Sequence, residues 1–197
     1  MPMDYPFITL YGVNNIGKTT QAERLVKMLK KNGQPAEHMK YPQYEVEPSG
    51  PFIDKILRQG QKTSSQKEVE MWMAINRHQA QLILEKKLKK GFVVSEDYVG
   101  TGIAWGMAHG SSREWMEAIN DHLRKEDVVI LLDGERFTDS IEANHVHETD
   151  QELVARCRQA HLELAKLYGW SVINANQSVE DIQNQIWEIA SNKCKLG

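Results

Sequence analysis

Residues 7–20 read FITLYGVNNIGKTT, a short apolar run that leads into a loop with two glycines. The spacing Gly12, four residues, Gly17, Lys18, Thr19 is typical of a loop that binds the phosphates of a nucleoside triphosphate, because the glycines let backbone N–H groups surround the phosphates. Lys18 is expected to reach the outer phosphates, and the Thr19 hydroxyl is expected to coordinate magnesium. The stretch therefore predicts a buried strand, a phosphate-binding loop, and a helix whose positive dipole end faces the phosphates.

The same alternation of strand and helix continues along the chain. Five short apolar runs predict strands that are buried on both faces, as in a parallel sheet: Phe7–Tyr11, His38–Tyr41, Phe92–Glu96, Val128–Asp133 and Trp170–Asn174. Helical patterns separate these runs, the longest over 66–90, and Thr149 or Asp150 and Ser178 are expected to begin two of them. The pattern predicts an α/β fold of three layers, a five-stranded parallel sheet flanked by helices, in a single domain over residues 1–197.

Composition excludes several other classes of protein. The chain has 197 residues, of which 41% are hydrophobic and 26% charged, as in ordinary globular proteins. No apolar run approaches the roughly 18 residues of a membrane span, and a net charge of -3 argues against binding to nucleic acid or to a membrane surface. Cys157 and Cys194 are too few for a disulfide framework or a zinc site, so we expect a reduced, cytoplasmic protein.

Four stretches, in the same order along the chain, resemble the thymidylate kinase family, whose members phosphorylate dTMP with ATP. They read FITLYGVNNIGKTTQAERL, then YPQYEVEPSGPFIDKIL, then MWMAINRHQAQLILEKKLKKGFVVSEDYVGTGIAWG, and lastly VVILLDGE, which is followed by a charged loop and HETDQELVARC. The resemblance runs from Phe7 to about Lys193. It implies a P-loop NTPase fold, a lid at about 134–150, Mg²⁺ as cofactor, ATP as phosphate donor, and a homodimer.

The resemblance also implies two sets of binding residues. The ATP site takes its contacts from Gly12, Asn15, Ile16, Gly17, Lys18, Thr19 and Thr20. The acceptor nucleotide takes its contacts from Asn14, Tyr44, Met73, Arg77, Tyr98, Thr101, Gly102 and Trp105. In this interpretation Arg77 binds a carbonyl of the base, Met73 packs on the base, and Trp105 crowds the 2′ position of the sugar. The alternatives are that Arg77 extends from the edge of an apolar stripe to solvent, and that Trp105 is a core residue.

An acidic pair ends the third predicted strand. Ligands of such sheets bind beyond the carboxyl ends of the strands, where Glu96 is placed to hold magnesium or to accept a proton. The family has Asp-Arg-Tyr or Asp-Arg-His here, whereas this chain has Glu96, Asp97 and Tyr98. Asp97 thus replaces an arginine that contacts the acceptor phosphate, and we predict catalytic roles for Lys18, Glu96 and Asp97. A second family arginine is also missing, since none falls between Tyr41 and Phe52, which leaves Lys40 or Arg58 as a substitute.

The catalytic arginine of the family is the other open point. Phosphoryl transfer requires cations around the transferred group, and thymidylate kinases supply an arginine from the P-loop or from the lid. Asn15 occupies the P-loop position, and the predicted lid holds Arg136 and no other arginine or lysine. We therefore predict that Arg136 is catalytic, with exposure to solvent as the alternative. Arg156 and Arg158, on the following helix, are further candidates.

The prediction for function is a thymidylate kinase that makes dTDP and ADP from dTMP and ATP. A deoxynucleoside kinase is the first alternative, because an acceptor without a phosphate needs no anion site. A nucleotide-binding protein that has lost phosphoryl transfer is the second, and the missing arginine motivates it.

Overall fold

A five-stranded parallel sheet forms the centre of the molecule, as predicted. The computed structural model describes residues 4–135 and 150–196. Its strands are β1 (Phe7–Tyr11), β2 (Ala36–Lys40), β3 (Phe92–Glu96), β4 (Val128–Asp133) and β5 (Ser171–Asn174), in the order β2-β3-β1-β4-β5. Two strands differ slightly from their predicted bounds. β2 spans Ala36–Lys40 instead of His38–Tyr41, because its ladder with β3 runs from Ala36 opposite Phe92 to Lys40 opposite Glu96. β5 begins at Ser171 instead of Trp170.

Seven helices connect and follow the strands in this part of the chain. They are α1 (Lys18–Lys31), α2 (Ser49–Gln59), α3 (Gln66–Leu88), α4 (Val99–Ala108), α5 (Arg113–Ile119), α6 (Gln151–Tyr168) and α7 (Val179–Cys194). The side chain of Asp150 accepts a hydrogen bond from the N–H of Leu153, and that of Ser178 accepts one from the N–H of Asp181. Ser178 is therefore confirmed as an N-cap, and of the two alternatives Thr149 and Asp150, the N-cap is Asp150. No described helix combines the length and the apolar character needed to cross a lipid bilayer.

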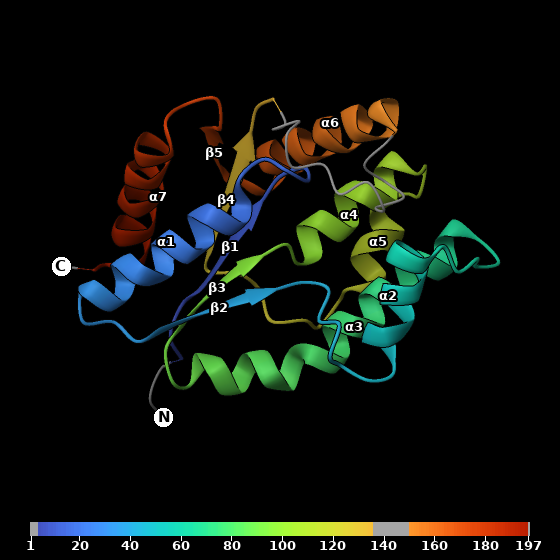
Figure 1. The fold of residues 1–197 in the computed structure, drawn as a ribbon, viewed down its shortest axis with the longest axis horizontal. Helices are drawn as coiled ribbons and strands as arrows, with labels where there is room; N and C mark the ends of the chain where they lie inside the picture. The colour runs from blue at the N-terminus through green and yellow to red at the C-terminus, as the bar shows by residue number, and fades with distance from the viewer. Residues whose placement is uncertain (1–3, 136–149, 197) are drawn as a thin grey trace.

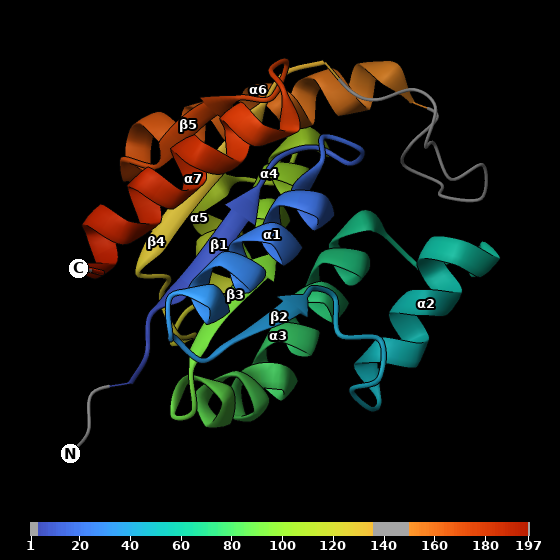
Figure 2. The ribbon, with the colours of Figure 1, turned by 60° about the vertical axis from the view of Figure 1, so that its left-hand side comes forward.

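The sheet is covered on both faces, which explains its continuous apolar strands. Successive side chains of β1 point to opposite faces: Ile8 packs in a cluster with Leu25 of α1 and Ile186 of α7. Phe7 packs in another cluster with Leu84 of α3 and with α6. Figures 1 and 2 show the sheet between these two layers, with α1 and α7 together on one side.

The carboxyl ends of the strands meet at one edge of the sheet. Strand β3 lies between β1 and β2, and the pairing register places the last residue of β3, Glu96, beside Leu10 of β1 and Lys40 of β2. The loop after β1 and the start of α4 leave from the same edge, and α2 lies beyond the ends of β2 and β3 (Figure 1). This edge is where open parallel sheets bind their ligands.

Candidate active site

A cavity of about 440 Å³ opens at this edge of the sheet. Its wall includes six residues of the predicted ATP site: Asn15, Ile16, Gly17, Lys18, Thr19 and Thr20. Glu96 and Asp97 line it as well. Every residue predicted to contact the acceptor lines it as well: Asn14, Tyr44, Met73, Arg77, Tyr98, Thr101, Gly102 and Trp105. The structure therefore brings two sets of residues, distant in sequence, to a single cavity.

The phosphate loop depends on its first glycine for its shape. Gly12 has a φ of 142°, and a Cβ at this position would lie 2.5 Å from the carbonyl oxygen of Leu132 in β4 and 2.9 Å from a methyl group of Ile16. Only glycine fits between the loop and the neighbouring strand. Gly12 itself is not among the residues that line the cavity, so its part in the site is to let the loop bend.

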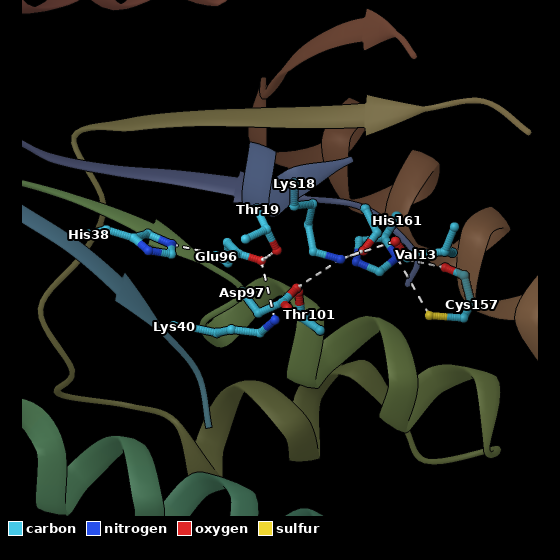
Figure 3. A network of polar contacts seen from close by, with 11 residues as sticks. Val13, Lys18, Thr19, His38, Lys40, Glu96, Asp97, Thr101, Cys157 and His161 are labelled. Carbon is cyan, nitrogen blue, oxygen red and sulfur yellow. Dashed lines mark hydrogen bonds and ion pairs between the residues drawn. The ribbon is translucent and has the colours of Figure 1, made fainter. Parts of the chain in front are cut away.

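Lys18 is buried inside the loop. Its Nζ donates hydrogen bonds to the carbonyl oxygens of Gly12, at 2.8 Å, and Val13, at 3.0 Å, and lies 3.6 Å from Oδ1 of Asp97 (Figure 3). These two carbonyl oxygens hold the ammonium group at the centre of the loop, and the hydrogen bonds to them can be exchanged for bonds to phosphate oxygens. This is a suitable position for a cation that binds the phosphates of a triphosphate.

Glu96 lies at the centre of a polar network (Figure 3). Its Oε2 accepts a hydrogen bond of 2.6 Å from the Thr19 hydroxyl and lies 3.5 Å from Nζ of Lys40, while its Oε1 lies 2.8 Å from Nε2 of His38. Burial by itself would raise the pKa of Glu96, but the contacts with His38 and Thr19 and the charge of Lys40 outweigh burial, and the pKa is lowered. Glu96 is therefore a carboxylate at neutral pH.

The hydroxyl of Thr19 and the carboxylate of Glu96 fit a magnesium ion, which prefers oxygen ligands in octahedral geometry. Among residues 4–135 and 150–196, no group of three or more His, Cys, Asp or Glu side chains could hold a metal ion without other ligands. We expect phosphate oxygens and water to supply the remaining ligands of a magnesium ion here.

Asp97 follows Glu96 in an unusual backbone conformation. Its φ is 59°, in the left-handed region that few residues other than glycine adopt. Its side chain is 15% exposed, and its Oδ1 accepts a hydrogen bond of 2.7 Å from the Thr101 hydroxyl. Burial raises the pKa of Asp97, and the opposing charge of Lys18 only partly offsets this effect. The acidic side chain is thus aimed at Lys18 and at the start of α4.

Arg77 of α3 is a buried residue of the cavity wall, and its guanidinium group lies against Gly102 of α4. The residue is only 5% exposed, so the alternative in which it extends to solvent is wrong. Its Nη1 donates to Oδ1 of Asn120 at 3.0 Å, and Asn120 is in turn held by a 2.8 Å hydrogen bond to the carbonyl oxygen of Met116. Burial lowers the pKa of Arg77, and an arginine stays cationic nonetheless.

Two features of this pocket leave Arg77 ready to bind a ligand. A Cβ on Gly102 would lie 2.3 Å from Nη2 of Arg77, so the glycine in α4 makes room for the guanidinium group. Within the described part of the chain, Nε of Arg77 and the hydroxyl groups of Tyr41 and Tyr98 are buried without a hydrogen-bond partner. Buried polar groups are rarely left unsatisfied, and their presence here is typical of a ligand site.

Sequence reasoning missed two residues of this pocket. Asn120, which orients Arg77, lies 43 positions away from it in the chain, and no local pattern marks it. Glu70 is 5% exposed and accepts a 2.7 Å hydrogen bond from the Ser111 hydroxyl through Oε2. Glu70 lies seven residues before Arg77, about two helical turns, so helical periodicity could have placed both on one face of α3.

The structure describes two of the three residues proposed as the catalytic arginine. Arg136 and almost all of the predicted lid lie outside the described residues. Arg158 donates to both carboxylate oxygens of Asp133, at 2.6 and 2.8 Å. Arg156 donates to the carbonyl oxygen of Ala108 and to Glu152. Neither Arg156 nor Arg158 is among the residues that line the cavity.

Comparison with known proteins identifies the family of the chain. The family model for thymidylate kinase matches residues 10–186. The chain is 27% identical to a probable thymidylate kinase of Methanocaldococcus jannaschii, over 93% of this chain and 95% of that protein. It is 28% identical to a thymidylate kinase of Danio rerio, over 96% of this chain and 91% of that protein.

The solved structure of thymidylate kinase from Candida albicans has the same fold, with a TM-score of 0.84 at 20% sequence identity. The match covers 98% of this chain and 94% of that one. Because the family model spans nearly the whole chain, the protein belongs to the thymidylate kinase family.

Proposed function

We propose that the protein is a thymidylate kinase, which transfers the γ-phosphate of ATP to dTMP and releases dTDP and ADP. One observation carries the proposal: the phosphate loop, with Lys18 and Thr19, and the residues around Arg77 line different parts of the same cavity. A triphosphate and a second nucleotide can therefore bind together. Their phosphates would meet near Glu96.

The residues of the site support direct transfer between the two nucleotides. An oxygen of the acceptor phosphate attacks the γ-phosphorus, and the bond between that phosphorus and the leaving ADP oxygen breaks. Lys18 moves from the loop carbonyls to the phosphates and neutralises the charge that develops on the transferred group. Thr19 and Glu96 would hold Mg²⁺, which supplies further positive charge to the phosphate oxygens when it is bound.

The acceptor base is held by the pocket between α3 and α4. Arg77, oriented by Asn120, donates hydrogen bonds to a carbonyl oxygen of the base, and guanidinium groups are suited to such contacts. Met73 and Trp105 line the same cavity and supply apolar contacts to the base and the sugar. The pocket thus favours a pyrimidine with carbonyl groups, such as thymine.

The setting of the enzyme is part of the same proposal. We place it in the cytoplasm as a single domain, since both cysteines are free and Cys157 is buried, as in a reducing compartment. We further propose that it forms a homodimer through α3. The outer side of this helix exposes four large apolar side chains: Met71, Ile75, Leu82 and Ile83.

A panel of acceptors tests the function directly. With ATP and Mg²⁺, dTMP is expected to gain phosphate, and thymidine is not. Phosphorylation of thymidine without dTMP would instead establish a nucleoside kinase, and the absence of any acceptor-dependent ATP consumption would establish a binding protein without transfer activity.

Lys18→Ala tests whether the activity belongs to this site. We expect kcat to fall by roughly 100-fold or more, because the variant lacks the cation that neutralises the transferred phosphate. The matched control is Lys27→Ala, which removes an exposed lysine from the same helix and should leave kcat unchanged. Equal activity of the two variants would contradict the assigned role of Lys18.

A further inference from the structure

We infer that Lys40 binds the phosphate of the acceptor nucleotide. The inference rests on the proposed function, because it concerns a monophosphate acceptor. A nucleoside monophosphate brings a charge of about −1.5 to −2 at neutral pH. This charge enters a cavity whose wall already contains three carboxylates: Glu70, Glu96 and Asp97. A cation must therefore stand close to the incoming phosphate.

The described wall of the cavity offers four arginine or lysine side chains: Lys18, Lys40, Arg58 and Arg77. Lys18 is enclosed by the phosphate loop and is assigned to the triphosphate. Arg77 is enclosed in the base pocket, where Asn120 holds it. Among the arginines and lysines in the described wall, this leaves Lys40 and Arg58 as partners for the acceptor phosphate.

Arg58 is engaged away from the reacting groups. Its guanidinium carbon lies 4.4 Å from the centre of the Tyr44 ring, and its Nη1 donates to Asp54, four residues earlier on α2, at 3.0 Å. A stacked and paired arginine loses both contacts if it moves to another ligand. Arg58 therefore stabilises α2 and the position of Tyr44.

Lys40 stands beside the reacting groups. It ends β2 directly opposite Glu96 in the ladder, and its Nζ lies 3.5 Å from Oε2 of Glu96. The same oxygen accepts the hydrogen bond from Thr19. A single oxygen, Oε2 of Glu96, thus lies between the ammonium group of Lys40 and the hydroxyl of Thr19. Figure 3 shows Lys40, Glu96 and Asp97 side by side.

This position matches the path of the acceptor. The attacking oxygen must reach the terminal phosphorus of a triphosphate that is bound at Lys18 and Thr19, so the acceptor phosphate must lie close to both residues. Lys40 is 58% exposed, and its flexible four-carbon stem lets the ammonium group move from Glu96 to that phosphate. The competing account is that Lys40 only balances the charge of Glu96.

Comparison of dTMP with thymidine separates these accounts, because the two ligands differ only in the phosphate. The measurements are the Kd of dTMP by calorimetry and the inhibition constant of thymidine against dTMP phosphorylation. They are made on the wild-type protein and on Lys40→Met, Lys40→Arg and Arg58→Met. For Lys40→Met we expect dTMP affinity to fall roughly 10- to 100-fold, the range for loss of a hydrogen bond to a charged group, while thymidine inhibits as before. Lys40→Arg should restore most of the dTMP affinity.

Three results would overturn the inference. They are an unchanged dTMP affinity in Lys40→Met, an equal loss for dTMP and thymidine, and a loss of the dTMP preference in Arg58→Met instead. The KM for ATP serves as a further readout and should stay within a few-fold of wild type. Failure of the proposed function looks different, since the wild-type protein would then not phosphorylate dTMP at all.

Discussion

Two residues that depart from the family pattern share a backbone conformation. Asn15 in the phosphate loop has a φ of 61°, and Asp97 after β3 has a φ of 59°. Asparagine and aspartate adopt this left-handed conformation more readily than other residues with a side chain. Neither position carries a positive charge, and the left-handed backbone at both favours a short polar side chain.

Gly102→Ala is expected to impair acceptor binding. The new methyl group would lie 2.3 Å from Nη2 of Arg77, so the guanidinium group must move from its place beside Asn120. We expect the KM for dTMP to rise roughly 10-fold, the cost of a displaced charged hydrogen bond, with little change in the KM for ATP. Steady-state kinetics with each substrate varied in turn measures both constants.

An Arg77→Ala background provides the control for this prediction. If Gly102→Ala acts through Arg77, it should have little further effect once the guanidinium group is gone. The full effect of Gly102→Ala in that background would show that the methyl group disturbs something else.

The predictability of the site differs from residue to residue. The phosphate loop can be predicted from spacing alone, because binding of phosphates by backbone N–H groups requires this spacing of Gly12, Gly17, Lys18 and Thr19. Asn120 could not be found, because its importance arises only when α3 and the segment after α5 pack together. The sequence likewise does not distinguish Lys40 from Arg58. Lys40 lies beside Glu96 only because β2 pairs with β3, and Arg58 contacts Tyr44 only because of how α2 folds back.

At the scale of elements, the sequence predicts helix boundaries best where a capping residue marks them. The predicted caps Asp150 and Ser178 both accept the expected hydrogen bonds. By contrast, α5 spans only Arg113–Ile119 and is too short for a helical period to stand out. The apolar pattern predicts β2 only from His38, because Ala36 and Glu37 are not strongly apolar. Pairing with Phe92 and Val93 of β3 extends the strand to Ala36.

Ser178→Ala should weaken the start of α7. Its Oγ accepts a hydrogen bond of 3.1 Å from the N–H of Asp181, and loss of an N-cap lowers the free energy of unfolding by roughly 0.5–2 kcal/mol. Urea denaturation measures this change. Ser191→Ala is the control within the same helix: its hydroxyl donates to the carbonyl oxygen of Glu188 and caps nothing, so we expect a change within about 0.5 kcal/mol. Equal losses in the two variants would rule out the capping explanation.

At the scale of the whole molecule, a buried histidine links stability to pH. His161 on α6 is enclosed beside Cys157, whose carbonyl oxygen lies 2.9 Å from Nδ1, and burial lowers the pKa of His161 from 6.5 to about 4. The unfolded chain therefore binds more protons than the folded protein between these two pH values. The contribution of His161 to the free energy of unfolding is largest above pH 6.5 and is lost as the pH falls toward 4.

His161→Gln tests this linkage. Between pH 7 and pH 5 the free energy of unfolding of the wild-type protein should fall by roughly 2 kcal/mol more than that of the variant, at about 1.4 kcal/mol per pKa unit. Urea titrations of both proteins at the two pH values give the four free energies. Parallel losses in the two proteins would contradict the assigned role of His161 in the pH dependence.

The central position of β1 has a consequence for the newly made chain. Ile8 pairs with Val94 on one side and with Val128 on the other, so the strand that leaves the ribosome first finds its two neighbours among the later ones. Until those segments have been synthesised, the backbone N–H and C=O groups along both edges of β1 have no strand to pair with, and such edges are templates for pairing with other chains. Contacts between such distant residues also form slowly. A nascent or truncated chain that stops before β4 is therefore expected to depend on molecular chaperones, although the finished sheet protects the same strand on every side.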